Sequence, residues 1–251
     1  MEDWPDLRVY QPELPAEGGP QRFALSAEES HHLVKVRRAR EGEPVLLLDG
    51  SGHRWLGTLT VAHAKQAEVE ARAIASLPVP PTRVIVGQAL PKGKTMDNVV
   101  HRAAELGVAV LVPLATHHSE VSLDAKRADS KVEKWTAVAI EALKQCANPH
   151  LPEIPPVQSL EAFLQAQAGA EVKLVAALTP ETRPLLELMQ ALSPRPGSIA
   201  LLVGPEGDFS DREYQQIFAH GYQPVSLGPR ILRVETAFVS AVSVIQAALG
   251  Q

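Results

Sequence analysis

The sequence predicts a mixed α/β chain, in which a small β-barrel-like domain precedes a larger domain built on a mostly parallel sheet. A proline-rich segment over residues 77–82 divides the 251-residue chain. Short strand-like runs separated by turns precede this segment, and strand-like runs alternating with amphipathic helices follow it. Because such alternation with short loops is typical of parallel α/β sheets, we expect domains at residues 1–76 and 83–251, joined by a linker.

The N-terminal region contains three β-prone runs and one helical run. The strands are predicted over residues 44–48, 54–61 and 66–74, and the helix over residues 27–38. The turn Asp49-Gly50-Ser51-Gly52 joins the first two strands. A region with more strands than helices predicts the barrel-like fold.

The C-terminal region alternates between the two kinds of element. Strands are predicted over residues 83–89, 108–114, 172–178, 199–203 and 223–227. Helices are predicted over residues 95–106, 129–147, 183–191, 211–220 and 236–249. Ser210 and Glu213 have the spacing of a capping box, which fixes the start of one helix. Cys146 falls in the 129–147 helix and is expected to be buried and inert.

Composition excludes several classes of protein. The chain is 45% apolar with a net charge of −5, which excludes intrinsic disorder as the dominant state. Its single cysteine excludes an intrachain disulfide, and its histidines lack the spacing of a metal site, so no metal is expected. The N-terminus is unlike a signal peptide, and the longest apolar stretch is too short and too polar to cross a bilayer. We therefore expect a soluble, cytoplasmic protein with no membrane partner.

One local patch carries positive charge in a chain that is acidic elsewhere. Four fixed positive charges fall within six residues, at Lys35, Arg37, Arg38 and Arg40. Such a patch suits phosphate contacts with nucleic acid, and a solvated helix face is the alternative interpretation. Lys92 and Lys94 flank a glycine between a predicted strand and helix, where phosphate contact and a solvated turn are again the two interpretations.

Two segments that join predicted strands to helices suit a ligand site. In Gly204-Pro205-Glu206-Gly207 the glycines would let backbone amides approach a ligand, but the pattern alone favours an ordinary strand-to-helix turn. The second segment carries Arg230 and Arg233, then Glu235, before an almost uncharged helix. Arginines at the entry to a buried helix need partners, which are carboxylates, backbone carbonyls or a ligand.

Together these segments resemble one family, the bacterial 16S ribosomal RNA (uracil-N3) methyltransferases of the SPOUT superfamily. The resemblance covers nearly the whole chain in order. Its most specific motifs are Gly204-Pro205-Glu206-Gly207 and Leu227-Gly228-Pro229-Arg230-Ile231-Leu232-Arg233…Glu235-Thr236-Ala237. Weaker matches include Arg8-Val9-Tyr10, Asp49-Gly50-Ser51-Gly52 and Leu90-Pro91-Lys92-Gly93.

The resemblance implies a fold, a cofactor and partners. It implies a PUA-like RNA-binding β-barrel, a SPOUT α/β domain with a deep trefoil knot, and a homodimer that acts on 16S rRNA of the small ribosomal subunit. The implied cofactor is S-adenosyl-L-methionine, held by Leu178, Thr179, Gly204, Pro205, Glu206, Gly207, Leu227, Gly228, Ile231, Leu232 and Thr236. The implied RNA contacts are Arg8, Lys35, Arg37, Arg38, Arg40, Lys92 and Lys94.

The implied reaction moves a methyl group to N3 of a uridine, with Arg230, Arg233 and Glu235 as candidate catalytic residues. Arg230 or Arg233 would stabilise the charge that develops on the uracil oxygens as N3 loses its proton. Glu235 is the nearest carboxylate for a base, and a structural ion pair with an arginine is the alternative. Two other functions stay open, namely a non-catalytic RNA-binding or ribosome-assembly module and a SPOUT enzyme with a different target nucleotide.

The chain departs from the family pattern at three places. Asp208 stands where the family usually has a second glycine, and the family usually has arginines near His118 and Asn148. We expect the first departure to affect the ligand loop and the other two to affect RNA contacts.

Overall fold

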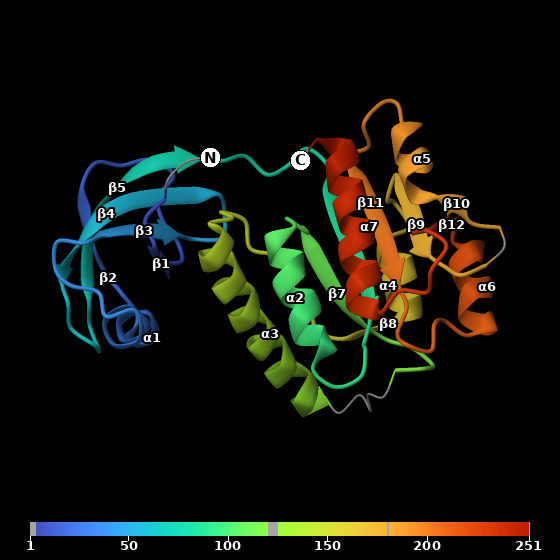
Figure 1. Cartoon of the computed structure of the whole chain (residues 1–251), viewed down its shortest axis with the longest axis horizontal. Helices are drawn as coiled ribbons and strands as arrows, with labels where there is room; N and C mark the ends of the chain where they lie inside the picture. Colours follow the sequence, from blue (N-terminus) through green and yellow to red (C-terminus); the bar gives the residue numbers. More distant parts are fainter. Residues whose placement is uncertain (1–3, 120–124, 180, 251) are drawn as a thin grey trace. The chain divides into compact units, whose positions relative to one another are not determined.

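The computed structural model describes residues 4–119, 125–179 and 181–250, with the side chains of residues 125–129 also left aside. The chain forms two units (Figure 1), one comprising Met1–Val79 and Ile140–Leu151, the other Pro80–Ala139 and Pro152–Gln251. The first division falls in the proline-rich segment. The inclusion of Ile140–Leu151 in the first unit has no signal in the sequence pattern.

The first unit contains a five-stranded sheet with the strand order β1-β3-β4-β5-β2. Its strands are β1 (Leu7–Tyr10), β2 (Gln21–Ala24), β3 (Pro44–Leu48), β4 (His53–Val61) and β5 (Glu68–Ser76). Trp55 is fully buried at the centre of this unit, and its indole N–H donates to the carbonyl of Pro15 at 2.9 Å. The edge strands β1 and β2 were not predicted, and three of the four residues of β2 are exposed.

The helix predicted over residues 27–38 forms in a different shape. α1 (Ala27–His31) begins at Ser26, whose hydroxyl accepts the N–H of Glu29, and passes into the π-helical turn η1 (His32–Val36). The N–H of Arg37 reaches back five residues to the carbonyl of His32 at 2.9 Å. A π turn depends on these backbone hydrogen bonds, and side-chain periodicity does not reveal it.

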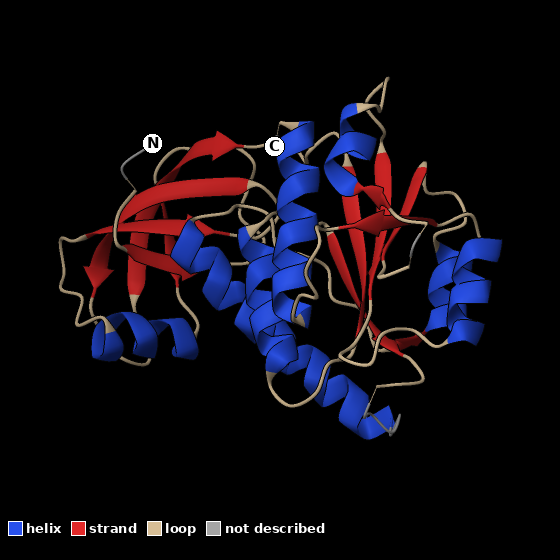
Figure 2. Ribbon diagram, turned by 45° about the vertical axis from the view of Figure 1, so that its right-hand side comes forward, coloured by secondary structure: helices blue, strands red, loops and turns tan. Residues whose placement is uncertain are grey.

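The second unit contains a seven-stranded, entirely parallel sheet with the strand order β10-β12-β9-β11-β6-β7-β8. Its strands are β6 (Arg83–Ala89), β7 (Val110–Ala115), β8 (Gln158–Ser159), β9 (Val172–Ala176), β10 (Arg183–Pro184), β11 (Ser198–Val203) and β12 (Gln223–Ser226). Figure 2 shows helices on both faces of this sheet. Strands covered on both faces are expected to be apolar throughout, and every residue of β11 after Ser198 is buried.

Six helices accompany this sheet in the part of the chain that the structure describes. They are α2 (Thr95–Glu105), α3 (Ala125–Cys146), α4 (Leu160–Ala166), α5 (Leu185–Gln190), α6 (Asp211–Ala219) and α7 (Val234–Leu249). The capping box predicted for α6 is confirmed, since Ser210 and Glu213 bond reciprocally. Helix α4 and the two-residue strands β8 and β10 were not predicted, because such short elements owe their form to tertiary packing.

The last turn of α3 belongs to the first unit. Arg8 donates to the carbonyls of Lys144 and Gln145 at 3.1 and 2.5 Å, and Arg54 donates to the carbonyl of Ala147 at 2.8 Å. These arginines satisfy carbonyls that a helix end leaves without partners. The prediction that Cys146 is buried is wrong, because α3 ends at Cys146 and its thiol lies outside the core that covers Leu143.

Candidate functional site

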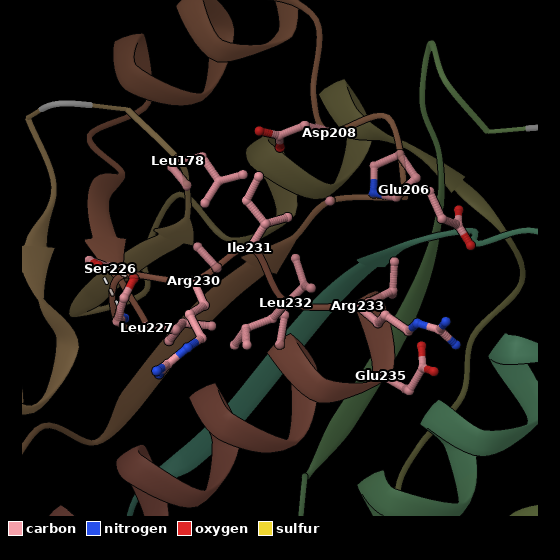
Figure 3. Close-up of a pocket in the computed structure, with 18 of the residues that line it drawn as sticks. Leu178, Glu206, Asp208, Ser226, Leu227, Arg230, Ile231, Leu232, Arg233 and Glu235 are labelled. Atoms are coloured by element: carbon pink, nitrogen blue, oxygen red, sulfur yellow. Dashed lines mark hydrogen bonds between the residues drawn. The ribbon is translucent and has the colours of Figure 1, made fainter.

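A pocket of about 440 Å³ opens at the carboxyl ends of the neighbouring strands β12, β9 and β11 (Figure 3). Open α/β sheets bind their ligands at this edge, and the volume is in the range of small-molecule sites. The lining comes from the loops after these strands and the first turns of α7 and α2. Its residues are Thr95, Ala176, Ala177, Leu178, Val203, Gly204, Pro205, Glu206, Asp208, Ser226, Leu227, Gly228, Arg230, Ile231, Leu232, Arg233, Val234, Glu235 and Ala237.

The loop after β12 is shaped by Ser226 and Gly228. The Ser226 hydroxyl accepts the N–H of Gly228 at 3.2 Å and approaches its carbonyl at 3.3 Å. Gly228 has a φ of 121°, a conformation that residues with a side chain rarely adopt. The glycine in this motif is therefore required by the turn that leads the chain to Arg230 and Ile231.

The loop after β11 is closely packed at both of its glycines. A Cβ atom at Gly204 would lie 2.9 Å from the Asp208 carboxylate, and one at Gly207 would lie 3.0 Å from the ring of His118. The Glu206 carboxylate accepts the backbone N–H of Lys92 at 3.1 and 3.2 Å. Packing within the protein thus leaves little room for a side chain at either glycine.

Most of the expected cofactor contacts come together in this pocket. Those in the lining are Leu178, Gly204, Pro205, Glu206, Leu227, Gly228, Ile231 and Leu232. Three lie outside it: Gly207 packs against His118, Thr236 is exposed on α7, and the buried Thr179 hydroxyl has no hydrogen-bond partner among the described residues.

The sequence interpretation missed several residues of the lining. They are Thr95, Ala176, Ala177, Val203, Ser226, Val234 and Ala237, whereas Asp208, expected to affect the ligand loop, also lines the pocket. Most are small or apolar, so no chemical motif marks them. Their available signal was position, since they stand at the ends of predicted strands or in the first turns of predicted helices.

The three candidate catalytic residues all line the pocket. In Figure 3, Arg233 and Glu235 lie on the same side of the pocket as Glu206, whereas Arg230 points to the opposite side. Within the described part of the chain, no ion pair joins Glu235 to either arginine. The expected alternative of a structural ion pair is therefore absent from this structure, and the Glu235 carboxylate is available to a ligand.

Two large apolar side chains are exposed at the pocket. Leu178 is 63% exposed and Ile231 is 83% exposed, and both belong to the lining. Large apolar side chains that stay open to solvent in a concave site offer contact area to an apolar or aromatic group of a ligand. The pocket therefore combines apolar surface with carboxylates and guanidinium groups.

The basic patch of the first unit is open to solvent. Lys35, Arg37, Arg38 and Arg40 are all exposed on η1 and the turn that follows it. Arg37 also donates to the carbonyl of Asp6 at 3.1 Å. The guanidinium group of Arg8 is instead used within the unit, where it donates to Pro5, Lys144 and Gln145.

The second expected cationic loop lies beside the pocket. Lys92 and Lys94 are exposed between β6 and α2, and the backbone of Lys92 is bonded to Glu206 of the lining. These lysines are therefore close to the loop after β11. They would meet a polyanion that approaches this side of the pocket.

Residues 4–119, 125–179 and 181–250 contain neither a membrane-spanning helix nor a metal-binding cluster. None of the helices there has the length and apolar character needed to cross a membrane. Nor do three or more His, Cys, Asp or Glu side chains in this part of the chain form a group that could hold a metal ion.

Comparison with protein families gives a separate match on each side of residue 77. Residues 78–246 match a family described as an RNA methyltransferase domain, and residues 25–71 match one described as an RNA methyltransferase PUA domain. A ribosomal RNA small subunit methyltransferase E from Synechocystis sp. is 33% identical over 90% of this chain and 73% of its own length. The Bacillus subtilis protein of the same name is 28% identical over 89% of each chain.

Two solved structures resemble the whole chain. A methyltransferase from Legionella pneumophila, with bound cofactor SAM, has a TM-score of 0.87 and 32% identity over 96% of this chain and 97% of its own. A ribosomal RNA small subunit methyltransferase E from Neisseria gonorrhoeae, bound to S-adenosyl methionine, has a TM-score of 0.85 and 28% identity over 98% of each chain. With a PUA-type domain before a methyltransferase domain and relatives matched along most of their length, the chain belongs to the ribosomal RNA small subunit methyltransferase E family.

Proposed function

We propose that this chain uses S-adenosylmethionine to methylate N3 of a uridine in 16S rRNA of the small ribosomal subunit. The observation that carries the proposal is the pocket at the ends of β9, β11 and β12, which is lined by both of the most specific sequence motifs. Related proteins from Legionella pneumophila and Neisseria gonorrhoeae hold the same cofactor.

The residues of the pocket fit S-adenosylmethionine by their chemistry. Leu178 and Ile231 offer apolar surface to the ligand, and the backbones of Gly204 and Gly228 offer hydrogen bonds. Asp208 supplies a carboxylate to a ligand that carries cationic groups. A pocket of about 440 Å³ is of the right order for a ligand of this size.

When bound, S-adenosylmethionine supplies a methyl group activated by its sulfonium. The protein then has to align uracil N3 with that group and remove the N3 proton. Glu235 is the candidate base, since its carboxylate lines the pocket without an ion pair among the described residues. Arg233 lies on the same side and would stabilise the negative charge on the uracil oxygens.

The proposal includes how the RNA is held. N3 lies on the Watson–Crick edge of uracil, so the target must be unpaired or flipped out of its helix. The exposed side chains of Lys35, Arg38 and Arg40 on the PUA-type unit suit contacts to the phosphates that flank it. The deep trefoil knot, the homodimer and the cytoplasmic location that the family resemblance implies are parts of the same proposal.

Two measurements test this function. Isothermal titration with S-adenosylmethionine tests the cofactor site, and mass spectrometry of 16S rRNA from a strain that lacks the gene tests the target. We expect the protein to bind S-adenosylmethionine. We also expect 16S rRNA from the strain without the gene to lack one N3-methyluridine. The intact gene should restore this nucleotide, and a gene carrying Arg233→Ala should not. Binding with unchanged 16S rRNA would point to another RNA. A folded protein without binding would favour an RNA-binding module.

A further inference from the structure

Asp208 occupies a backbone conformation that usually belongs to glycine. Its φ is 59°, in the left-handed region that costs energy for residues with a side chain, although Asp is more tolerant than most. Its N–H closes the turn onto the carbonyl of Pro205 at 3.0 Å. This conformation explains why a glycine would fit here, and it raises the question of what the carboxylate does.

The carboxylate is held firmly by one of its two oxygens. Oδ1 accepts the N–H of Phe209 at 2.8 Å and the hydroxyl of Tyr214, from α6, at 2.8 Å. Burial and the neighbouring Asp208 raise the pKa of Tyr214 well above its ordinary value, so this hydroxyl stays protonated and donates. Two neutral donors therefore fix the orientation of the carboxylate and leave its charge in place.

This charge has no counterion in the described part of the chain, where no ion pair involves Asp208. Asp208 is half-buried and lines the pocket, and Figure 3 shows it at the end of the pocket where Leu178 and Ile231 lie. Glu206, another carboxylate of the lining, is already bonded to the N–H of Lys92. An oriented, partly desolvated anion without a counterion favours a cationic ligand.

We infer that Asp208 makes the pocket selective for charge, so that it prefers the sulfonium form of the cofactor to the neutral product left after transfer. This inference rests on the proposed function. When the S–CH₃ bond breaks and the N3–CH₃ bond forms, the sulfur keeps the bonding electron pair and becomes a neutral thioether. The ligand therefore loses one positive charge, and with it the attraction to Asp208. The carboxylate favours binding of the donor and release of S-adenosylhomocysteine.

The test compares two ligands and three variants by isothermal titration of the full chain. The ligands are S-adenosylmethionine and S-adenosylhomocysteine, and the variants are Asp208→Asn, Asp208→Gly and Asp211→Asn. Asn keeps the shape and tolerates a left-handed φ, while Gly removes both the carboxylate and the backbone cost. Asp211 is an exposed residue of α6 outside the lining, so its variant controls for the loss of one negative charge nearby.

We expect both Asp208 variants to weaken binding of S-adenosylmethionine by roughly fivefold or more, while binding of S-adenosylhomocysteine stays within about twofold. Asp211→Asn should leave the preference between the two ligands unchanged. If the variants weaken binding of both ligands equally, charge selection is overturned. Asp208 would then form a hydrogen bond to a part that both ligands share. If both Asp208 variants bind the two ligands with wild-type affinity, then Asp208 only stabilises the turn. If the wild-type protein binds neither ligand, the proposed function itself fails.

Discussion

At the scale of single residues, the two arginines of the pocket have different surroundings. Arg233 lies with Glu235 and Glu206, whereas Arg230 points to the opposite side of the pocket. If Arg233 stabilises the charge on uracil, Arg233→Ala should lower the rate of methyl transfer by about a hundredfold or more while cofactor affinity changes little. Lysine should restore part of the rate, because it keeps the charge but lacks the planar fork. Single-turnover transfer of labelled methyl to rRNA measures this.

Arg230→Ala is the matched control, since it removes the same group from the other side of the same loop. We expect its rate to fall less than that of Arg233→Ala. Equal rates for both variants and the wild-type protein would place charge stabilisation elsewhere. A larger loss of rate for Arg230→Ala than for Arg233→Ala would assign charge stabilisation to Arg230.

The residues that carry charge or a recognisable motif could be predicted from the sequence, and most residues that shape the walls could not. Arg230, Arg233 and Glu235 were predicted and do line the pocket. Gly207 was expected at the ligand, but it packs against His118, which is far away in the sequence. The sequence shows that a glycine is present, and only the fold shows which neighbour requires it.

At the scale of elements, the loop after β11 combines two glycines with different neighbours. A side chain at Gly204 meets the Asp208 carboxylate, which Phe209 and Tyr214 hold in place. A side chain at Gly207, which lies outside the pocket lining, meets Cβ and the ring of His118, whose Nδ1 lies 2.9 Å from the carbonyl oxygen of Asp208. Gly204→Val should therefore weaken cofactor binding by tenfold or more, on the order of 1.4 kcal/mol, and Gly207→Val should weaken it less. Calorimetry on both folded variants tests this order.

The thermal midpoints of both variants serve as the control for folding. A Gly204→Val protein that melts like the wild type and binds S-adenosylmethionine with unchanged affinity would contradict the prediction. If Gly207→Val proves the weaker binder, then the contact of this loop with His118, on the loop after β7, contributes more to the site than the glycine in the lining does.

Elements with a clear hydrophobic period could be predicted, and short or irregular ones could not. The strands β6, β9, β11 and β12 lie within about two residues of their predicted ranges, because buried parallel strands are apolar runs. The helix predicted over residues 27–38 was placed correctly, yet it divides into α1 and the π turn η1. That division follows from backbone hydrogen bonds, and the pattern of side chains does not predict them.

At the scale of the molecule, the first unit is completed by a helix end from far along the chain. Lys144 is buried there and bonds Glu29 at 2.9 Å and Glu141 at 2.6 Å. The residues before and after this segment belong to the other unit. Local patterns cannot predict such a partner, because the contacts join residues more than a hundred positions apart.

Lys144→Met should destabilise the first unit by about 3–5 kcal/mol, because it leaves the buried carboxylate of Glu29 without its counterion. Glu141 is 54% exposed, so Glu141→Gln should cost less than about 1 kcal/mol. Adding Glu29→Gln to Lys144→Met should recover much of the loss. Urea unfolding of the three variants measures this, and equal stability of Lys144→Met and the wild type would contradict it.

The pKa values of both buried partners, Glu29 and Lys144, are raised, Glu29 by its burial, and the alkaline pH dependence of the cluster follows from the shift of Lys144. Burial alone would lower the pKa of Lys144, but hydrogen bonds to Glu141 and Glu29 raise it above its ordinary value. A pKa raised by folding contributes stability that is complete below the unfolded pKa and is lost as pH rises through the folded one. The contribution of Lys144 should therefore persist at neutral pH and disappear only in strongly alkaline solution. Its loss near pH 7 would contradict this assignment.

The whole chain carries a net charge of −5, so its affinity for RNA must come from a local surface. Lys35, Arg38 and Arg40 are exposed together on the PUA-type unit, and each phosphate they neutralise releases counterions. Replacing Arg38 and Arg40 by alanine should weaken RNA binding and lower the slope of log K against log salt by up to about two. Lys65→Ala, an exposed cation of the same unit outside the patch, should change neither. Since cofactor affinity should stay constant in both variants, an unchanged salt slope in the double variant would mean that this patch is only a solvated surface.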